Sequence, residues 1–96
     1  MFDRVLKRMR ELIHSRQYIM PLHAEDEMDA DGLTVYDVES VILTGQITER
    51  QKDRASAEWK YLISGHALAG EAVTVVAKFS LTGKLVFVTV FRESRK

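Results

Sequence analysis

The sequence contains no cysteine, and this absence excludes several functional classes. Without cysteine, the chain has no disulfide framework, no thiolate nucleophile and no cysteine-ligated zinc. Long apolar runs are absent too, because the longest, Leu85–Val88, falls far short of the roughly 20 residues that span a bilayer. No apolar stretch of signal-peptide type follows the basic N-terminus. We therefore expect a cytoplasmic protein that does not enter the membrane.

The sequence also has no net charge, but its charges are unevenly distributed. Residues 1–23 carry +3, residues 24–49 carry −8 without a lysine or arginine, and residues 50–96 carry +5. A nonspecific binder of polyanions would be basic throughout, so strong nonspecific affinity for nucleic acid is not expected. A basic face in the C-terminal half is compatible with these numbers. The acidic middle could attract a basic partner or could simply be solvated.

The first half of the chain has helical patterns. We expect a single domain over residues 1–96, with an amphipathic helix over 1–16 and a pair of helices over 22–44. Pro21, the only proline, ends a short extended segment before the second helix, which runs from about His23 to Ala30. Gly32 suits the end of that helix, and Thr34 with Asp37 matches a capping box that begins the third.

The second half has the alternation of strands. Four strands are predicted at 46–50, 59–64, 72–80 and 85–92, with short connections. Helices followed by such strands predict an α+β fold, with the N-terminal helices packed on one face of a four-stranded, mainly antiparallel curved sheet. If Val73, Val75, Ala77 and Phe79 face the helices, Lys78 faces the open side.

The acidic stretch EMDADGLTVYDVE, residues 27–39, has the early spacing of a calcium-binding EF-hand loop. Such a loop closes with a bidentate glutamate at its twelfth position, which here is Val38. We therefore interpret the stretch as a corner between two helices. His23, Asp26 and Glu27 could share a helix face, but nothing supplies further metal ligands at recognisable spacing. No metal site and no cofactor are predicted.

Basic and aromatic side chains gather on the predicted strands. Cations that approach phosphate and aromatics that stack on bases are what an RNA-binding sheet needs, although a solvated sheet face has the same composition. The candidates for nucleic-acid binding are Arg50, Lys52, Arg54, Tyr61, Phe87 and Phe91.

Several landmarks, in this order, resemble the bacterial domain-of-unknown-function family DUF4258, whose members look like RelE/ParE- and BrnT-like toxin components of type II toxin-antitoxin systems. They are Leu22-His23-Ala24, Met28, Asp31-Gly32-Leu33-Thr34, Asp37-Val38, Val41-Ile42, Ile47-Thr48-Glu49-Arg50, Trp59-Lys60-Tyr61 and Val88-Thr89-Val90-Phe91-Arg92.

The resemblance implies a helix-plus-curved-sheet fold and a metal-independent endoribonuclease that uses the 2′-hydroxyl of the RNA as nucleophile. Such a protein needs a base or acid and cations for the phosphate charge. His23 is the catalytic candidate that the resemblance supports, and strand geometry adds Lys60, Lys78 and Arg92. The implied partners are an antitoxin protein and RNA. The alternative is a noncatalytic protein-binding module, which could form a homodimer.

Overall fold

The computed structural model of the chain describes residues 1–93, which form three helices and a five-stranded sheet. The helices are α1 (Asp3–His14), α2 (Leu22–Ala30) and α3 (Val35–Thr44). The strands are β1 (Tyr18–Ile19), β2 (Gln46–Lys52), β3 (Trp59–His66), β4 (Ala72–Phe79) and β5 (Leu85–Arg92). None of these helices is long and apolar enough to cross a membrane.

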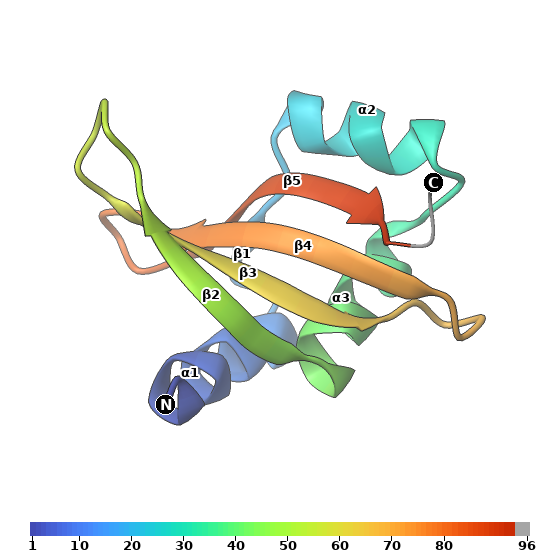
Figure 1. Cartoon of the computed structure of the whole chain (residues 1–96), viewed down its shortest axis with the longest axis horizontal. Helices are drawn as coiled ribbons and strands as arrows, with labels where there is room; N and C mark the ends of the chain where they lie inside the picture. Colours follow the sequence, from blue (N-terminus) through green and yellow to red (C-terminus); the bar gives the residue numbers. More distant parts are fainter. Residues whose placement is uncertain (94–96) are drawn as a thin grey trace.

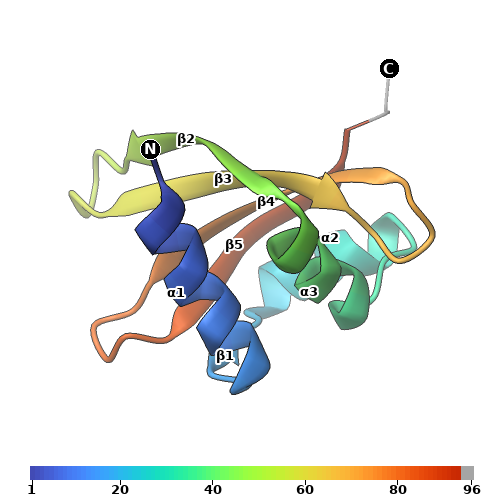
Figure 2. The same cartoon turned by 90° about the horizontal axis from the view of Figure 1, so that it is seen from below.

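The sheet is mixed, mostly antiparallel and open. Its strand order is β1-β5-β4-β3-β2, and only β1 is parallel to its neighbour, through Tyr18↔Leu85 and Ile19↔Val86. The helices lie on one side of the sheet and leave the other side uncovered (Figures 1 and 2). The predicted α+β fold is therefore confirmed, and β1 adds a fifth strand to the four that were expected.

Alternation along β4 decides which face is covered. Val73, Val75 and Ala77 are fully buried against the helices, together with Ile63 of β3 and Phe87 of β5. Lys78 points to the uncovered side, as predicted, because successive side chains of a strand point to opposite faces. This side of the sheet is called the open face below.

The corner between α2 and α3 has the predicted capping chemistry. The Thr34 hydroxyl accepts a hydrogen bond from the Asp37 N–H at 3.3 Å, and the Asp37 carboxylate accepts one from the Thr34 N–H at 2.8 Å. Gly32 has a φ of 70°, the left-handed conformation that glycine adopts without strain. The stretch with the spacing of a calcium loop is thus a helix end followed by a helix start.

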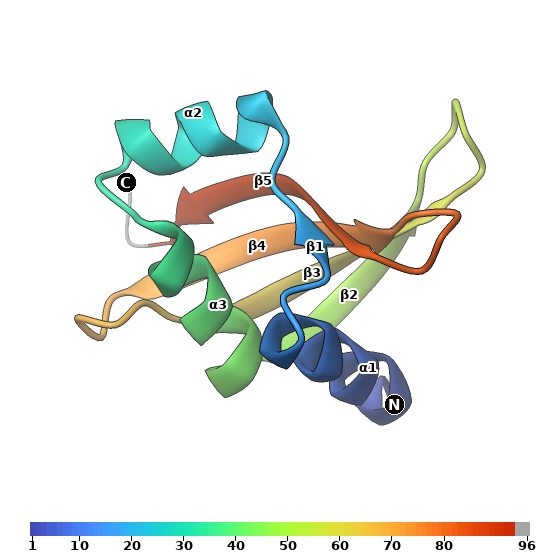
Figure 3. The same ribbon diagram turned by 180° about the vertical axis from the view of Figure 1, so that it is seen from behind.

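The helices take different positions under the sheet. α3 packs beneath β3, whereas α2 lies along the outer edge of β5, as seen from behind (Figure 3). The close approach of α3 requires Gly65, because a Cβ atom there would lie 2.6 Å from the Val41 carbonyl oxygen. α1 packs beside α3, and its Arg10 donates to the carbonyls of Ile42 and Gly45 at the end of α3, at 3.0 and 2.9 Å.

Candidate functional site

Lys60 and Lys78 lie close together on the open face. Tyr61 and Ala77 are paired between the antiparallel strands β3 and β4, and Lys60 precedes Tyr61 while Lys78 follows Ala77. Both are held by acids at the ends of the β2–β3 loop: Lys60 Nζ lies 3.8 Å from Asp53, and Lys78 Nζ lies 2.8 Å from Glu58. The hydrogen bond from Lys78 lowers the pKa of Glu58, so this acid stays ionised opposite its lysine. Neither lysine is an unpaired cation.

Arg92 lies elsewhere, at the end of β5 on the helix-facing side. Its guanidinium makes an ion pair with Glu71 at 2.9 Å and lies beside Gly32 in the α2–α3 corner. Arg92 pairs with Val73, five residues along β4 from Lys78, which is about 17 Å at the usual rise of a strand. Arg92 therefore ties the end of β5 to the β3–β4 loop and cannot act together with the two lysines.

His23 lies at a third location, in the first turn of α2. Its side chain is 75% exposed and lies 3.2 Å from Glu27, four residues later on the same helix. Asp31, whose side chain accepts from the Arg92 N–H, comes eight residues after His23, and this spacing corresponds to about 12 Å along a helix. The four predicted catalytic residues thus occupy three places and do not form one site.

Two of the predicted nucleic-acid-binding aromatics are in the core. Phe87 is fully buried and packs edge-on against Tyr18, with ring centroids 5.4 Å apart. Phe87, a candidate for base stacking from the sequence, is therefore not on the surface, because the register of β5 turns its side chain toward the helices. Tyr61 is also buried, between Phe2 and Phe79. Phe91, by contrast, is exposed near the end of α2.

The cations of β2 meet an exposed tryptophan. The Arg50 guanidinium carbon lies 4.0 Å from the centre of the Trp59 ring, and Lys52 Nζ lies 5.6 Å from it. Lys52 is directly opposite Trp59 in the ladder, and Arg54 follows in the loop. Within residues 1–93, none of these three cations makes an ion pair with an acid. We call Arg50, Lys52, Arg54 and Trp59 the arm cluster.

The arm cluster lies on the β2–β3 hairpin, whose loop projects beyond the rest of the sheet (Figure 1). Ile63, Tyr61 and Trp59 share one face of β3, so this row runs from the core outward to a tryptophan that is 40% exposed. Trp59 was not among the predicted site residues. The sequence feature that could have identified Trp59 is its position on the helix-facing side of β3, opposite two cations of the preceding strand.

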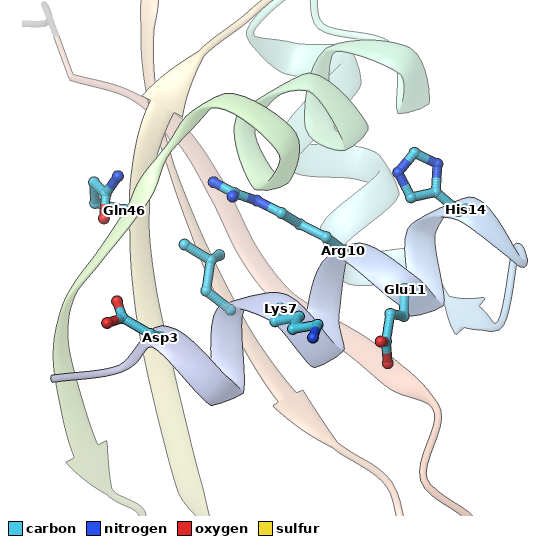
Figure 4. A pocket seen from close by; sticks show the side chains of 7 residues that line it. Asp3, Lys7, Arg10, Glu11, His14 and Gln46 are labelled. Atoms are coloured by element: carbon cyan, nitrogen blue, oxygen red, sulfur yellow. The ribbon is translucent and has the colours of Figure 1, made fainter.

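A groove of about 320 Å³ runs beside α1, and Figure 4 shows its lining residues. Charges of both signs line it: Asp3, Lys7, Arg10, Glu11 and His14, with Gln46 on the other side. Arg10 points toward the end of α3, where it already donates to two backbone carbonyls (Figure 4). Among the described residues, no three His, Cys, Asp or Glu side chains come together as ligands for a metal. We therefore interpret this groove as a feature of the packing between α1 and α3.

Comparison with known proteins identifies a family and no individual relative. The family model described as "Domain of unknown function (DUF4258)" matches residues 22–92, which include α2, α3 and strands β2 to β5. No curated protein and no solved structure matches the chain.

Proposed function

We propose that this chain, which belongs to the DUF4258 family, is a toxin-like component that binds single-stranded RNA through the arm cluster of its β2–β3 hairpin. The family description states no activity, so the proposal depends on the geometry of the side chains. The proposal can be extended to two more specific functions, cleavage of the bound RNA and binding of an antitoxin protein.

One contrast carries the proposal: the arm cations are unpaired, whereas every predicted catalytic residue is next to a carboxylate. Lys60, Lys78, Arg92 and His23 face Asp53, Glu58, Glu71 and Glu27 respectively. A phosphate would have to displace these acids. In the described part of the chain, Arg50, Lys52 and Arg54 have no such competitor.

The arm cluster combines the two interactions that single-stranded RNA recognition uses. Lysine and arginine contact the phosphates, and exposed aromatic or guanidinium planes stack on unpaired bases. Here the Arg50 plane is already held over the Trp59 ring, so part of its side-chain entropy is lost before a ligand binds. The net charge of zero predicts that such binding is local and of moderate strength.

Fluorescence anisotropy with a labelled single-stranded RNA tests the proposal. Trp59→Ala is expected to weaken binding between about fivefold and 150-fold, the range for loss of one stacking contact. Three phosphate contacts predict a slope of log affinity against log salt of about −2. The control is Lys84→Ala, which removes an exposed cation of the β4–β5 loop that is not part of the arm cluster. Equal affinity of Trp59→Ala and the unchanged protein would reject the arm as the RNA site.

A noncatalytic protein-binding module is the second candidate. It is favoured by the separation of His23, Arg92 and the Lys60–Lys78 pair into three places. Such a module could act as a homodimer. Sedimentation would detect the dimer as a rise in the apparent mass with increasing protein concentration.

A further inference from the structure

A second surface, away from the arm cluster, carries an apolar groove on the outside of α3. Tyr36, Leu43 and Leu68 line it, with exposed fractions of 57%, 36% and 70%. Its volume is about 320 Å³, and Glu39, Ser40 and Thr44 complete the lining. The lining residues of α3 lie on the side of this helix away from Val38, Val41 and Ile42, which are buried in the core, and Leu68 comes from the β3–β4 loop. Packing of this domain therefore does not explain the groove.

Three polar side chains of the groove, Glu39, Ser40 and Thr44, are hydrogen-bonded within the protein. The Ser40 hydroxyl donates to the His66 carbonyl at 2.7 Å, and the Thr44 hydroxyl donates to the Ser40 carbonyl at 2.7 Å. The Tyr18 hydroxyl donates to the Glu39 carboxylate at 2.5 Å. A ligand would consequently meet mainly carbon atoms on the floor of the groove, because the Ser40 and Thr44 hydroxyls are turned toward backbone carbonyls. Several exposed apolar side chains around one hollow are typical of an interaction surface.

Two acids belong to the groove: Glu39 lines it, and Asp37 accepts a hydrogen bond from the Leu68 N–H at 2.9 Å. Residues 22–44, which form α2 and α3, contain seven acids and neither lysine nor arginine. Glu25, Asp26 and Asp29 are exposed on α2 and have no side-chain partner within residues 1–93. A segment that lies along α3 toward its first turn would continue toward the corner with α2 (Figure 3). An apolar floor beside acids is complementary to an apolar segment flanked by cations.

We propose that this groove docks a short amphipathic helix of another protein, with leucine-like side chains on one face and lysine or arginine beside them. The apolar side chains would fill the space between Tyr36, Leu43 and Leu68, as in other complexes where a helix enters a groove. The cations would lie toward Glu39 and Asp37. This site is separate from the proposed RNA-binding arm, so either can fail without the other.

The test uses three synthetic peptides and amide chemical shifts of the isotope-labelled protein. One peptide has leucines at helical spacing (i, i+3, i+7) with lysines between them. The second replaces the lysines with glutamates, and the third scrambles the lysine peptide. Only the first is expected to shift the signals of Tyr36, Leu43 and Leu68. Leu68→Ser should weaken its binding at least about tenfold, whereas Leu81→Ser, at an exposed leucine in the β4–β5 loop, should not.

Equal binding of the glutamate or the scrambled peptide would overturn the proposal, since it requires both charge and apolar register. Shifts confined to α2 would also overturn it, because they would indicate attraction by charge alone. Self-association of the protein that Leu68→Ser abolishes would assign the groove to a second copy of this chain instead. Folding of Leu68→Ser is checked by the unchanged shifts of buried Ile63 and Val75.

Discussion

The carboxylate of Glu27 accepts a hydrogen bond from the backbone N–H of Val90 at 3.1 Å, so that a helix side chain bonds to the edge of the sheet. One turn later, Asp31 accepts from the N–H of Arg92 at 3.2 Å. Glu27 and Asp31 are four residues apart, about 6.0 Å along a helix, and Val90 and Arg92 are two apart, about 6.7 Å along a strand. The two acids are therefore spaced to meet the two N–H groups. Because β1 covers only Leu85 and Val86, these acids protect the remaining edge of β5.

Replacement of Glu27 by alanine should therefore destabilise the fold. The change leaves the partly buried N–H of Val90 without its charged acceptor, which costs about 1.5–3 kcal/mol of unfolding free energy. Urea denaturation followed by circular dichroism measures this difference.

Two variants separate this effect from general surface charge. Asp26→Ala removes an exposed neighbouring acid and is expected to stay within about 0.5 kcal/mol of the unchanged protein. His23→Ala removes only the exposed ion pair with Glu27, which is worth at most about 1 kcal/mol. A Glu27→Ala protein no less stable than Asp26→Ala would contradict the role of this acid at the sheet edge.

Acid should loosen the α2–α3 corner through Asp37. Burial alone would raise the pKa of Asp37, but hydrogen bonds from the N–H groups of Thr34 and Leu68 outweigh it, and the pKa is lowered. A carboxylate with a lowered folded-state pKa contributes stability above its unfolded value of about 3.9 and loses it as the pH falls through the folded value. The stability of Asp37→Asn should thus depend less steeply on pH below about 4. Parallel slopes for the two proteins in acid urea titrations would refute this assignment.

Alkali should act through Tyr18. Burial, together with the hydrogen bond to Glu39, raises the pKa of Tyr18 to about 12. Since the unfolded value is about 10, the folded state keeps this proton longer, and stability falls as the pH rises from about 10 to 12. The unfolding free energy of Tyr18→Phe should therefore change less with pH between about 10 and 12 than that of the unchanged protein. The measurement is urea denaturation at several alkaline pH values, and the difference between the proteins cancels the titration of lysines and other tyrosines.

Local patterns predicted most of the fold. The alternation in β4 and the capping box at Thr34 and Asp37 act over a few residues, so the sequence displays them directly. The pairing of β1 is not visible in the sequence, because two residues carry no periodic signal and their partners lie far along the chain at Leu85 and Val86. Strand pairing over such a distance depends on the packing of the whole chain.

The candidate site was less predictable, for a related reason. Residue type shows that Arg92 and Lys78 are cations, but it does not show that Glu71 and Glu58 neutralise them from other loops. Phe87 illustrates the same limit on a strand with apolar residues on both faces. Pairing between β4 and β5 shifts between Val76 and Ala77, and this irregularity decides which face Phe87 takes.

The buried position of Phe87 can be measured directly. Phe87→Ala should lower the unfolding free energy by about 3–5 kcal/mol, since it removes a fully buried ring and leaves a cavity. Phe91→Ala, at an exposed phenylalanine of the same strand, serves as the matched control and should cost much less. Similar losses for both variants in urea would show that Phe87 does not contribute to the core.

Lys60 and Lys78 are the pair among the four predicted catalytic residues that could act on one phosphate. If they stabilise the charge that develops during cleavage, the protein should cut single-stranded RNA in the presence of EDTA. RNA with a 2′-deoxy group at the cleaved position should resist, because the nucleophile is missing. The double variant Lys60→Gln and Lys78→Gln should lower the rate at least about 100-fold. Glu58→Gln should raise it, because Lys78 would lose its competing carboxylate.

The control for this assay is Lys84→Gln, which changes an exposed lysine in the β4–β5 loop and should leave the rate unchanged. Anisotropy of the same preparations reports RNA binding separately from cleavage. If the unchanged protein binds RNA but leaves it intact, the ribonuclease prediction fails and the arm cluster is a binding site alone. If it cleaves RNA and the double lysine variant cleaves equally well, the open face is excluded as the site of the chemistry, and His23 becomes the next residue to replace.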